Sequence, residues 1–224
     1  MNEKRKTICI IANGEKPIEK ILKDILEQAD LVIAADGGSA ICRELGILPD
    51  IIVGDFDSLK SITADIFPDS EIIEVIDQEH SDLEKALDVA ISYEPECVHI
   101  MAASGLRGDH YLANILLLNN LELSGRTFKS EIYLYDNWGR MSLLEPGRHK
   151  FHNRKGQTVS FFSLGTLSKL TLKGFQYNLE DAFSKGNFTG LSNVIEEDEC
   201  LLEFRGSKML WYECFAEKEK LDNE

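Results

Sequence analysis

Residues 31–59 read LVIAADGGSAICRELGILPDIIVGDFDSL. The apolar runs LVIAA and IIVG are typical of buried strands, and SAICRELG between them has the spacing of a helix. A strand, a helix and a second strand in this order predict two parallel strands joined by a crossover helix. Aspartates follow both strands directly, which raises the question of why like charges stand at the ends of apolar strands.

The same alternation of strand and helix continues through the first part of the chain. Further strands are predicted at TICIIA, EIIEVI, VHIMAA and EIYLYD, and further helices at PIEKILKDILEQ, SDLEKALDVAISY and DHYLANILLLNNL. Strands that alternate with helices favour a mostly parallel sheet covered on both faces. We therefore predict an α/β domain over residues 1–140.

Beyond residue 140 the helical spacing stops. Short strand-like runs separated by glycine and proline turns replace it: MSLLE, TVSFFSL, LSKLTLKGF, CLLEFRG and SKMLWYECF. Such a pattern is typical of an antiparallel β structure. We predict a second, all-β and sandwich-like domain over residues 141–224.

The composition excludes some partners. The formal net charge is −15, which argues against binding to nucleic acid or to an anionic membrane. The acidity belongs to the first 145 residues, with 27 acids against 13 bases. If this part of the chain binds a polyphosphate, a cation has to offset the repulsion, and a divalent metal is the expected one.

The cysteines and the N-terminus indicate the compartment. The five cysteines are widely spaced and contain no C-x-x-C pair, so we expect reduced, buried thiols. The apolar run after the basic start MNEKRK is too short for a signal peptide, and no segment has the length of a membrane span. We expect a cytoplasmic protein that does not bind membranes.

Acids follow strands at three places. Asp36 follows LVIAA, Asp55 and Asp57 follow IIVG, and Asp82 comes after EIIEVI at the start of a helix. Ligands of open parallel sheets bind beyond the carboxyl ends of the strands, where these acids would meet. Clustered carboxylates without His or Cys suit Mg²⁺, which accepts carboxylate, water and phosphate oxygens.

Each of these acids has a simpler interpretation when it is taken alone. A D-x-D tripeptide is more often a solvated turn, and Asp82 also stabilises a helix N-terminus through the helix dipole. Ser81 and Glu84 fit a capping box, so Ser81 is the predicted N-cap and Asp82 falls in the first turn. The conjunction of three acidic strand ends favours the metal site.

The loop ASGLRGDH presents a second set of candidates. Arg107 stands between two glycines at a helix N-terminus, a natural place for a phosphate. His110 and Asn114 lie on the helix that follows, although a lone histidine is more often structural than catalytic. The turn after the first strand adds Asn13 and Gly14, for which a plain connecting turn is an equally good interpretation. Neither a P-loop nor G-x-G-x-x-G is present, so phosphates would be held differently.

These motifs together resemble one known family. The order NGE, AADGGSA, LGILPDIIVGDFDS, DQ-x-x-SDLEKAL and G-x-R-x-DH-x-LANI resembles thiamine pyrophosphokinases. The later segments GQTVSFFSL, LKGFQYNL and FTGLSN resemble the thiamine-binding β domain of that family, so the resemblance covers nearly the whole chain. Leu106 departs from the common G-G-R-x-D-H pattern, and Val194 replaces a frequent acid.

The resemblance implies that the thiamine hydroxyl attacks the β-phosphorus of Mg-ATP to give thiamine diphosphate and AMP. It assigns Mg²⁺ to Asp36, Asp55, Asp57 and Asp82, and catalysis to Asp55, Asp57, Asp82 and Arg107. The ATP-binding residues that it implies are Asn13, Gly14, Asp36, Gly37, Lys85, Arg107, Asp109, His110 and Asn114. The base that takes the hydroxyl proton stays open, with Asp82 or Asp57 as the candidates.

Thiamine is a flat cation, which an aromatic face and amide groups would suit. The resemblance implies Gln78, Tyr177, Ser192 and Asn193 as its contacts, although core packing explains Tyr177 equally well. It also implies a homodimer with the thiamine site at the subunit interface.

Three rival functions stay open. They are a pyrophosphokinase for another hydroxymethyl heterocycle such as a pterin, a phosphatase with a nucleophilic Asp55, and a non-catalytic sensor of nucleotide or thiamine. A phosphatase would form a trappable aspartyl-phosphate, and a sensor would make no AMP.

Overall fold

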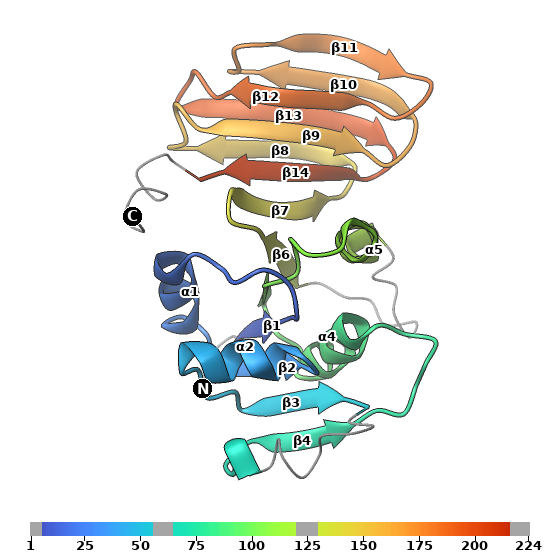
Figure 1. Ribbon diagram of the computed structural model, residues 1–224. Coiled ribbons are helices and arrows are strands. Elements are labelled where there is room, and N and C mark those ends of the chain that lie inside the picture. The colour runs from blue at the N-terminus through green and yellow to red at the C-terminus, as the bar shows by residue number, and fades with distance from the viewer. Residues whose placement is uncertain (1–5, 56–64, 120–129, 216–224) are drawn as a thin grey trace, which may run out of the picture. The chain divides into compact units, whose positions relative to one another are not determined.

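The protein is described here from a computed structural model, which covers residues 6–55, 65–119 and 130–215 (Figure 1). The chain divides into two compact units, Met1–Asn137 and Trp138–Glu224. Each unit has its own hydrophobic core and is described by itself.

The first unit contains a six-stranded sheet. Its strands are β1 (Thr7–Ile11), β2 (Leu31–Ala35), β3 (Ile51–Gly54), β4 (Glu71–Glu74), β5 (Cys97–Met101) and β6 (Glu131–Tyr135). They lie in the order β6-β5-β1-β2-β3-β4, and all five neighbouring pairs are parallel. Figure 1 shows β1 to β4 stacked in this order. The predicted parallel sheet is confirmed.

Helices connect these strands. The described ones are α1 (Glu19–Leu26), α2 (Gly38–Leu45), α4 (Asp82–Ser92) and α5 (Gly108–Asn119). Right-handed crossovers place α1 and α2 on one face of the sheet and α4 and α5 on the other. On one side of β1 lie β2, β3 and β4, and on its other side lie β5 and then β6. The strand order therefore reverses between β1 and β5. Such a reversal is where ligands bind in open α/β sheets.

Most strands of this sheet are largely apolar because helices cover both faces, whereas the edge strand β4, EIIE, begins and ends with exposed glutamates. Ile8, Ile10, Ile33 and Ile52 are fully buried, with no exposed surface. A parallel sheet buried on both sides requires such continuous runs rather than an alternating pattern. No helix in the described parts of the chain is long and apolar enough to cross a membrane.

The second unit is a pair of antiparallel sheets, as predicted from the sequence. One sheet has the order β12-β9-β14-β7 and the other β11-β10-β13-β8. The strands are β7 (Gly139–Leu144), β8 (Gly147–His152), β9 (Thr158–Ser163), β10 (Leu167–Lys173), β11 (Leu179–Ser184), β12 (Thr189–Val194), β13 (Glu199–Gly206) and β14 (Met209–Cys214).

Aromatic side chains fill the core between these two sheets. Phe161 on β9 is fully buried, and its ring centroid lies 5.1 Å from that of Trp211 and 5.6 Å from that of Phe175. Both pairs have the edge-to-face geometry that aromatic quadrupoles favour. Phe161 therefore packs against β14 and against the segment that follows β10.

We predict that Phe161→Ala destabilises the second unit by about 3–5 kcal/mol, because it removes a buried ring and leaves a cavity. Urea unfolding followed by tryptophan fluorescence measures the change. Phe183→Ala is the matched control, since the Phe183 side chain is 72% exposed and should change stability little. Equal effects of the two substitutions would contradict the assigned core.

Candidate functional site

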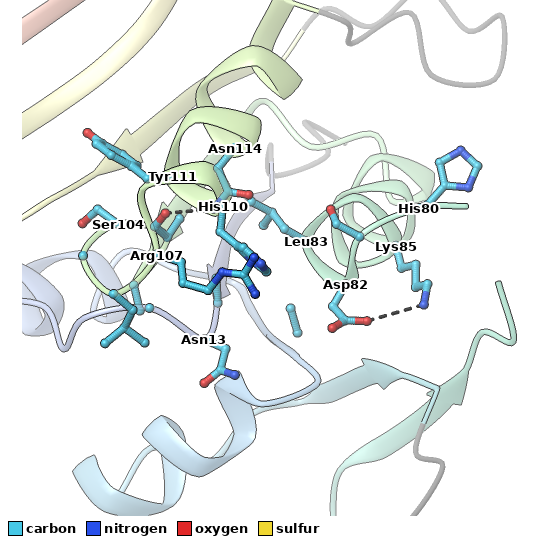
Figure 2. Close-up of a pocket in the computed structure, with 18 of the residues that line it drawn as sticks. Asn13, His80, Asp82, Leu83, Lys85, Ser104, Arg107, His110, Tyr111 and Asn114 are labelled. Carbon is cyan, nitrogen blue, oxygen red and sulfur yellow. Dashed lines mark hydrogen bonds and ion pairs between the residues drawn. The ribbon is translucent and has the colours of Figure 1, made fainter. Parts of the chain in front are cut away.

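A pocket of about 630 Å³ lies in the first unit, at the carboxyl edge of its sheet. Residues that follow β1 and β5 line it, so it sits where the strand order reverses. The lining residues from the predicted site are Asn13, Gly14, Asp55, Gln78, Asp82, Lys85, Arg107, His110 and Asn114. The structure thus brings together residues from four separate segments of the chain, several of which are labelled in Figure 2.

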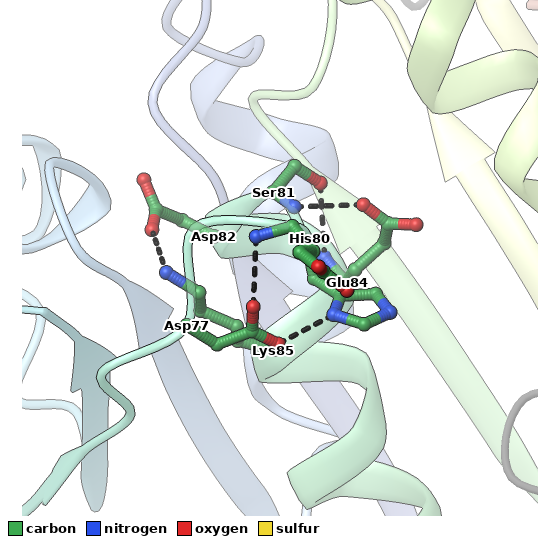
Figure 3. A network of polar contacts seen from close by, with 7 residues as sticks. Asp77, His80, Ser81, Asp82, Glu84 and Lys85 are labelled. Carbon is green, nitrogen blue, oxygen red and sulfur yellow. Dashed lines mark hydrogen bonds and ion pairs between the residues drawn. The ribbon is translucent and has the colours of Figure 1, made fainter.

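The N-terminus of α4 holds one side of the pocket. The Glu84 backbone N–H donates to Ser81 Oγ at 3.3 Å, and the Ser81 backbone N–H donates to Glu84 Oε2 at 2.7 Å. This confirms the predicted capping box, and Figure 3 shows both contacts. Because both ends of the box are satisfied, the first turn of α4 is well defined. Asp82 is therefore presented to the pocket from a fixed backbone.

Lys85 lies one turn below Asp82 on the same helix. Its side chain is only 4% exposed, and Nζ lies 3.4 Å from Asp82 Oδ1 (Figure 3). A buried ammonium group requires nearby negative charge, since burial removes its hydration. Lys85 also lines the pocket, and its predicted contact with ATP stays a prediction.

Asp36 and Asp55 stand at the ends of the neighbouring strands β2 and β3. Burial raises the pKa of the Asp36 carboxyl, and the charges of Asp82 and then Asp55 raise it further. The three acids are therefore close enough to repel one another. A Cβ on Gly54 would lie 2.7 Å from Asp36 Oδ1, so glycine is needed for this close approach.

The acid cluster suits a divalent cation in its chemistry. Its donors are hard carboxylate oxygens, and the charges of Asp82 and Asp55 add to burial in raising the pKa of Asp36. In residues 6–55, 65–119 and 130–215, no three acidic, histidine or cysteine side chains are already arranged around one metal position. Asp57, which the sequence placed in this set, lies outside the described residues. The magnesium site therefore stays a prediction.

Arg107 lines the pocket from the loop before α5. Its guanidinium donates from Nε to Asp109 Oδ1 at 3.1 Å and from the terminal nitrogen to Asp109 Oδ2 at 2.6 Å. Donation from Arg107 lowers the pKa of the Asp109 carboxyl to about 2. Asp109 is not among the residues that line the pocket, and its predicted contact with ATP stays a prediction.

The turns after β1 and β5 are tied together. The Gly14 backbone N–H donates to the Ala102 carbonyl at 2.6 Å, and the Glu15 N–H donates to the Ser104 carbonyl at 2.7 Å. A Cβ on Gly14 would lie 2.4 Å from both carbonyl oxygens. Asn114 joins from α5, where its Nδ2 donates to the Ala103 carbonyl at 2.8 Å. Gly14 therefore permits the close contact that shapes the pocket floor.

The loop before Arg107 tolerates the departure from the common family pattern. Gly105 has φ +88°, and a Cβ there would lie 2.4 Å from the Glu15 Cβ. Leu106 is absent from the residues with positive φ and is 79% exposed. Only the first glycine of this turn is required by its backbone, so leucine fits at the second position.

Two predicted ATP-site residues, Asp36 and Gly37, lie beside the pocket without lining it. A Cβ on Gly37 would fall 2.2 Å from Asn13 Nδ2, so Gly37 lets the Asn13 side chain lie against the start of α2. Asp36 has φ +38°, in the left-handed region. Gly37 therefore contacts the pocket lining through Asn13.

Sequence reasoning missed four residues of this site. Tyr111 lines the pocket and its hydroxyl donates to Asp136 Oδ2 at 3.0 Å, while burial raises the Tyr111 pKa. Asp136 directly follows β6, and this strand-end position was a usable signal. Asp77 and His80 also line the pocket and form an ion pair through His80 Nδ1.

The predicted thiamine contacts lie in both units. Gln78 lines the pocket of the first unit. In the second unit Tyr177 is 64% exposed, and Asn193 is buried. Asn193 Oδ1 accepts from the Tyr177 N–H at 3.0 Å, and its Nδ2 donates to the Tyr177 carbonyl at 2.9 Å. Ser192 has φ +53°, and its N–H donates to Ser160 Oγ. Asn193 thus fixes the backbone that presents Tyr177.

We predict that Asp36→Asn raises the melting temperature of the metal-free protein at pH 7. A raised pKa means that the ionised carboxyl is less favourable in the folded state, and the amide removes that charge. Asparagine also tolerates the positive φ at this position. Calorimetry in EDTA measures the shift.

The gain in melting temperature should disappear below about pH 3.8, the ordinary pKa of this carboxyl, because the folded and the unfolded protein then both carry the proton. Asp69→Asn, at an exposed acid outside the pocket, is the matched control. A lower melting temperature for Asp36→Asn at pH 7 would contradict the inference that the ionised Asp36 carboxyl destabilises the folded protein.

Comparisons with known proteins identify a family. Two family profiles match, "Thiamin pyrophosphokinase, catalytic domain" over residues 22–133 and "Thiamin pyrophosphokinase, vitamin B1 binding domain" over residues 148–208. The chain is 29% identical over 197 residues to thiamine pyrophosphokinase of Bacillus subtilis (strain 168), covering 85% of this chain and 90% of the relative.

Solved structures show the same fold. The crystal structure of thiamine pyrophosphokinase from Bacillus subtilis matches with TM-score 0.77 and 26% identity, over 93% of this chain and 99% of that chain. The yeast thiamin pyrophosphokinase structure matches with TM-score 0.80 at 13% identity, over 100% and 90% of the two chains, which shows the fold alone. Since the catalytic-domain profile by itself spans half of the 224 residues, this chain belongs to the thiamine pyrophosphokinase family.

Proposed function

We propose that this protein transfers a diphosphate group from Mg-ATP to the hydroxyl of thiamine, giving thiamine diphosphate and AMP. The observation that carries the proposal is the pocket at the strand reversal, where the acids Asp55 and Asp82 face Arg107 across one cavity. Membership of the family supports the substrates, because both matched profiles carry the name of this activity.

The acids would hold the metal. Asp36, Asp55 and Asp82, with Asp57, supply the oxygen ligands, and Lys85 orients the Asp82 carboxylate from below. Bound Mg²⁺ supplies charge neutralisation on the triphosphate and a template for its orientation. The repulsion among the acids is relieved when the cation is present, so a site that destabilises the free protein becomes favourable with its ligand.

The reaction is an in-line displacement at the β-phosphorus. A bond forms between the thiamine hydroxyl oxygen and this phosphorus, while the bond to the oxygen that bridges the α- and β-phosphates breaks, and that oxygen leaves with AMP. The hydroxyl proton passes to Asp82 or Asp57. Arg107 stabilises the charge on the phosphates, and Asp109 keeps its guanidinium in place. Most of the catalysis comes from positioning and electrostatics.

The second unit would supply the aromatic contact for thiamine. Tyr177 exposes its ring, and Asn193 fixes the backbone on both sides of it. An exposed aromatic face suits a flat cation. Gln78 and Ser192 complete the polar contacts. We further propose a cytoplasmic homodimer in which the thiamine site lies at the subunit interface.

The decisive experiment is to incubate the protein with ATP, Mg²⁺ and thiamine and to separate the products. We expect AMP and thiamine diphosphate in equal amounts. ADP would indicate transfer of a single phosphate, free phosphate would indicate a hydrolase, and the absence of AMP would indicate a sensor. A hydroxymethyl-pterin offered in place of thiamine tests the remaining rival.

We predict that Asp55→Asn and Asp57→Asn each lower kcat by about 100-fold or more, since each removes a charge that organises the metal and phosphates. Their melting temperatures in EDTA should not fall. Asp69→Asn is the control and should keep normal turnover. Normal Mg²⁺-dependent turnover in either site variant would remove that residue from the proposed mechanism.

We also predict that Tyr177→Ala raises the KM for thiamine by about tenfold, in line with the loss of a cation–π contact. Tyr177→Phe keeps the ring and should retain most of the affinity. Because the side chain is 64% exposed, stability should change little in both variants. An unchanged KM for thiamine in Tyr177→Ala would show that the ring does not contact the substrate.

A further inference from the structure

The pocket of the first unit has two chemically different ends. Figure 2 shows Asp82, Lys85 and His80 on one side and Ser104 and Tyr111 on the other, with Arg107 and His110 between them. Asp77 belongs to the charged end through its ion pair with His80. Ala102, Ala103, Gly105 and Leu106, which flank Ser104 in the chain, are also neutral lining residues, whereas the neutral Gln78, Ser81 and Leu83 belong to the segment of Asp82. A ligand with a charged part and an apolar part fits this division.

The geometry of the proposed reaction decides which part of the ligand goes where. In an in-line displacement the attacking and leaving oxygens stand on opposite sides of the phosphorus. Gln78, the proposed thiamine contact in this unit, lines the pocket and stands between Asp77 and His80 in the sequence. If thiamine approaches from there, the AMP part of the nucleotide extends away from it. That direction leads past Arg107 to the neutral end.

We propose that Leu106 and Tyr111 form the subsite for the purine base of the nucleotide. This proposal rests on the proposed function, which it extends by assigning the base to named residues. Leu106 is 79% exposed, although it is a large apolar side chain at the pocket wall. A flat base packed against it would remove this apolar surface from water, which is favourable.

Tyr111 presents a fixed surface for the same base. Its ring is half-buried, and its hydroxyl donates to Asp136 Oδ2 at 3.0 Å. An aromatic side chain that is already held in place loses little conformational freedom when a ligand binds. Asp136 is therefore a positioning residue, which acts through Tyr111 and does not contact the base.

The Leu106 contact belongs to this chain and not to the common family motif. The motif has a second glycine at this position, which offers no side chain to a ligand. The backbone of the turn requires glycine only at Gly105, so the side chain at position 106 is free to change. Leu106 therefore adds apolar contact area to the site without altering the turn that carries Arg107.

The first test separates base contacts from phosphate contacts. Calorimetric titrations with AMP and with inorganic tripolyphosphate plus Mg²⁺ are compared for Leu106→Ala, Tyr111→Ala and the unchanged protein. We expect the Kd for AMP to rise about fivefold for Leu106→Ala, as for loss of part of a buried leucine contact. The Kd for tripolyphosphate, which has no base, should stay the same.

Two further variants are controls for this titration. Leu48→Ala makes the same change at a leucine that is 80% exposed and outside the pocket, and it should leave both affinities unchanged. Tyr111→Phe keeps the ring and should bind AMP more tightly than Tyr111→Ala. The proposal is overturned if Leu106→Ala leaves AMP binding unchanged or weakens both ligands equally.

The second test locates the base directly and needs no catalytic activity. The protein is irradiated with 8-azido-AMP and digested with trypsin, which cleaves after Lys85, Arg107 and Arg126. We expect the label in the peptides 86–107 or 108–126, which carry Leu106 and Tyr111. Label confined to the peptide 61–85, which carries Asp77 to Lys85, would place the base at the charged end and overturn the proposal.

The outcomes also distinguish this inference from the proposed function. Formation of thiamine diphosphate and AMP with label only in peptide 61–85 would support the function and refute the base subsite. Label in the expected peptides without formation of thiamine diphosphate would support the subsite and refute the transferase.

Discussion

The site depends on the forced proximity of carboxylates that repel one another. Asp36 and Asp55 follow β2 and β3, Asp82 begins α4, and burial together with the charges of Asp82 and Asp55 raises the pKa of Asp36. The sheet and the capped helix hold these acids in place, and the buried Lys85 offsets only part of their charge. An arrangement that costs stability in the free protein is retained where a ligand relieves it, which is the usual relation between stability and function.

Two backbone features make this proximity possible. Gly54 lets β3 end against the Asp36 carboxylate, and the capping box of Ser81 and Glu84 fixes the turn that carries Asp82 and Lys85. On the other side of the pocket, Gly14 ties the turn after β1 to the turn after β5. These contacts are made by rigid elements, so the polar groups are placed before any ligand binds.

Much of the fold was readable from local patterns, and the exceptions have clear reasons. The six described strands of the first unit were all predicted, as was the Ser81 cap, because most of them are nearly continuous apolar runs. In the second unit β8, β11 and β12 were missed. In β8, GRHKFH, the exposed Arg148, Lys150 and His152 alternate with half-buried residues, and β11 and β12 are edge strands rich in polar residues. Edge strands bury little, so their sequences carry a weak signal.

For the site, the sequence by itself showed which polar residues stand at the strand ends. Buried parallel strands are apolar, so the first polar residues after them are easy to recognise. It could not show that Asp136 holds Tyr111, that Lys85 lies beneath Asp82, or that Asn193 fixes the Tyr177 backbone. Two of these three contacts join residues 16 to 25 positions apart, and the third depends on how deeply one helix face is buried. Local spacing predicts elements and their ends, whereas only the packed tertiary structure decides which side chains meet and which of them are removed from water.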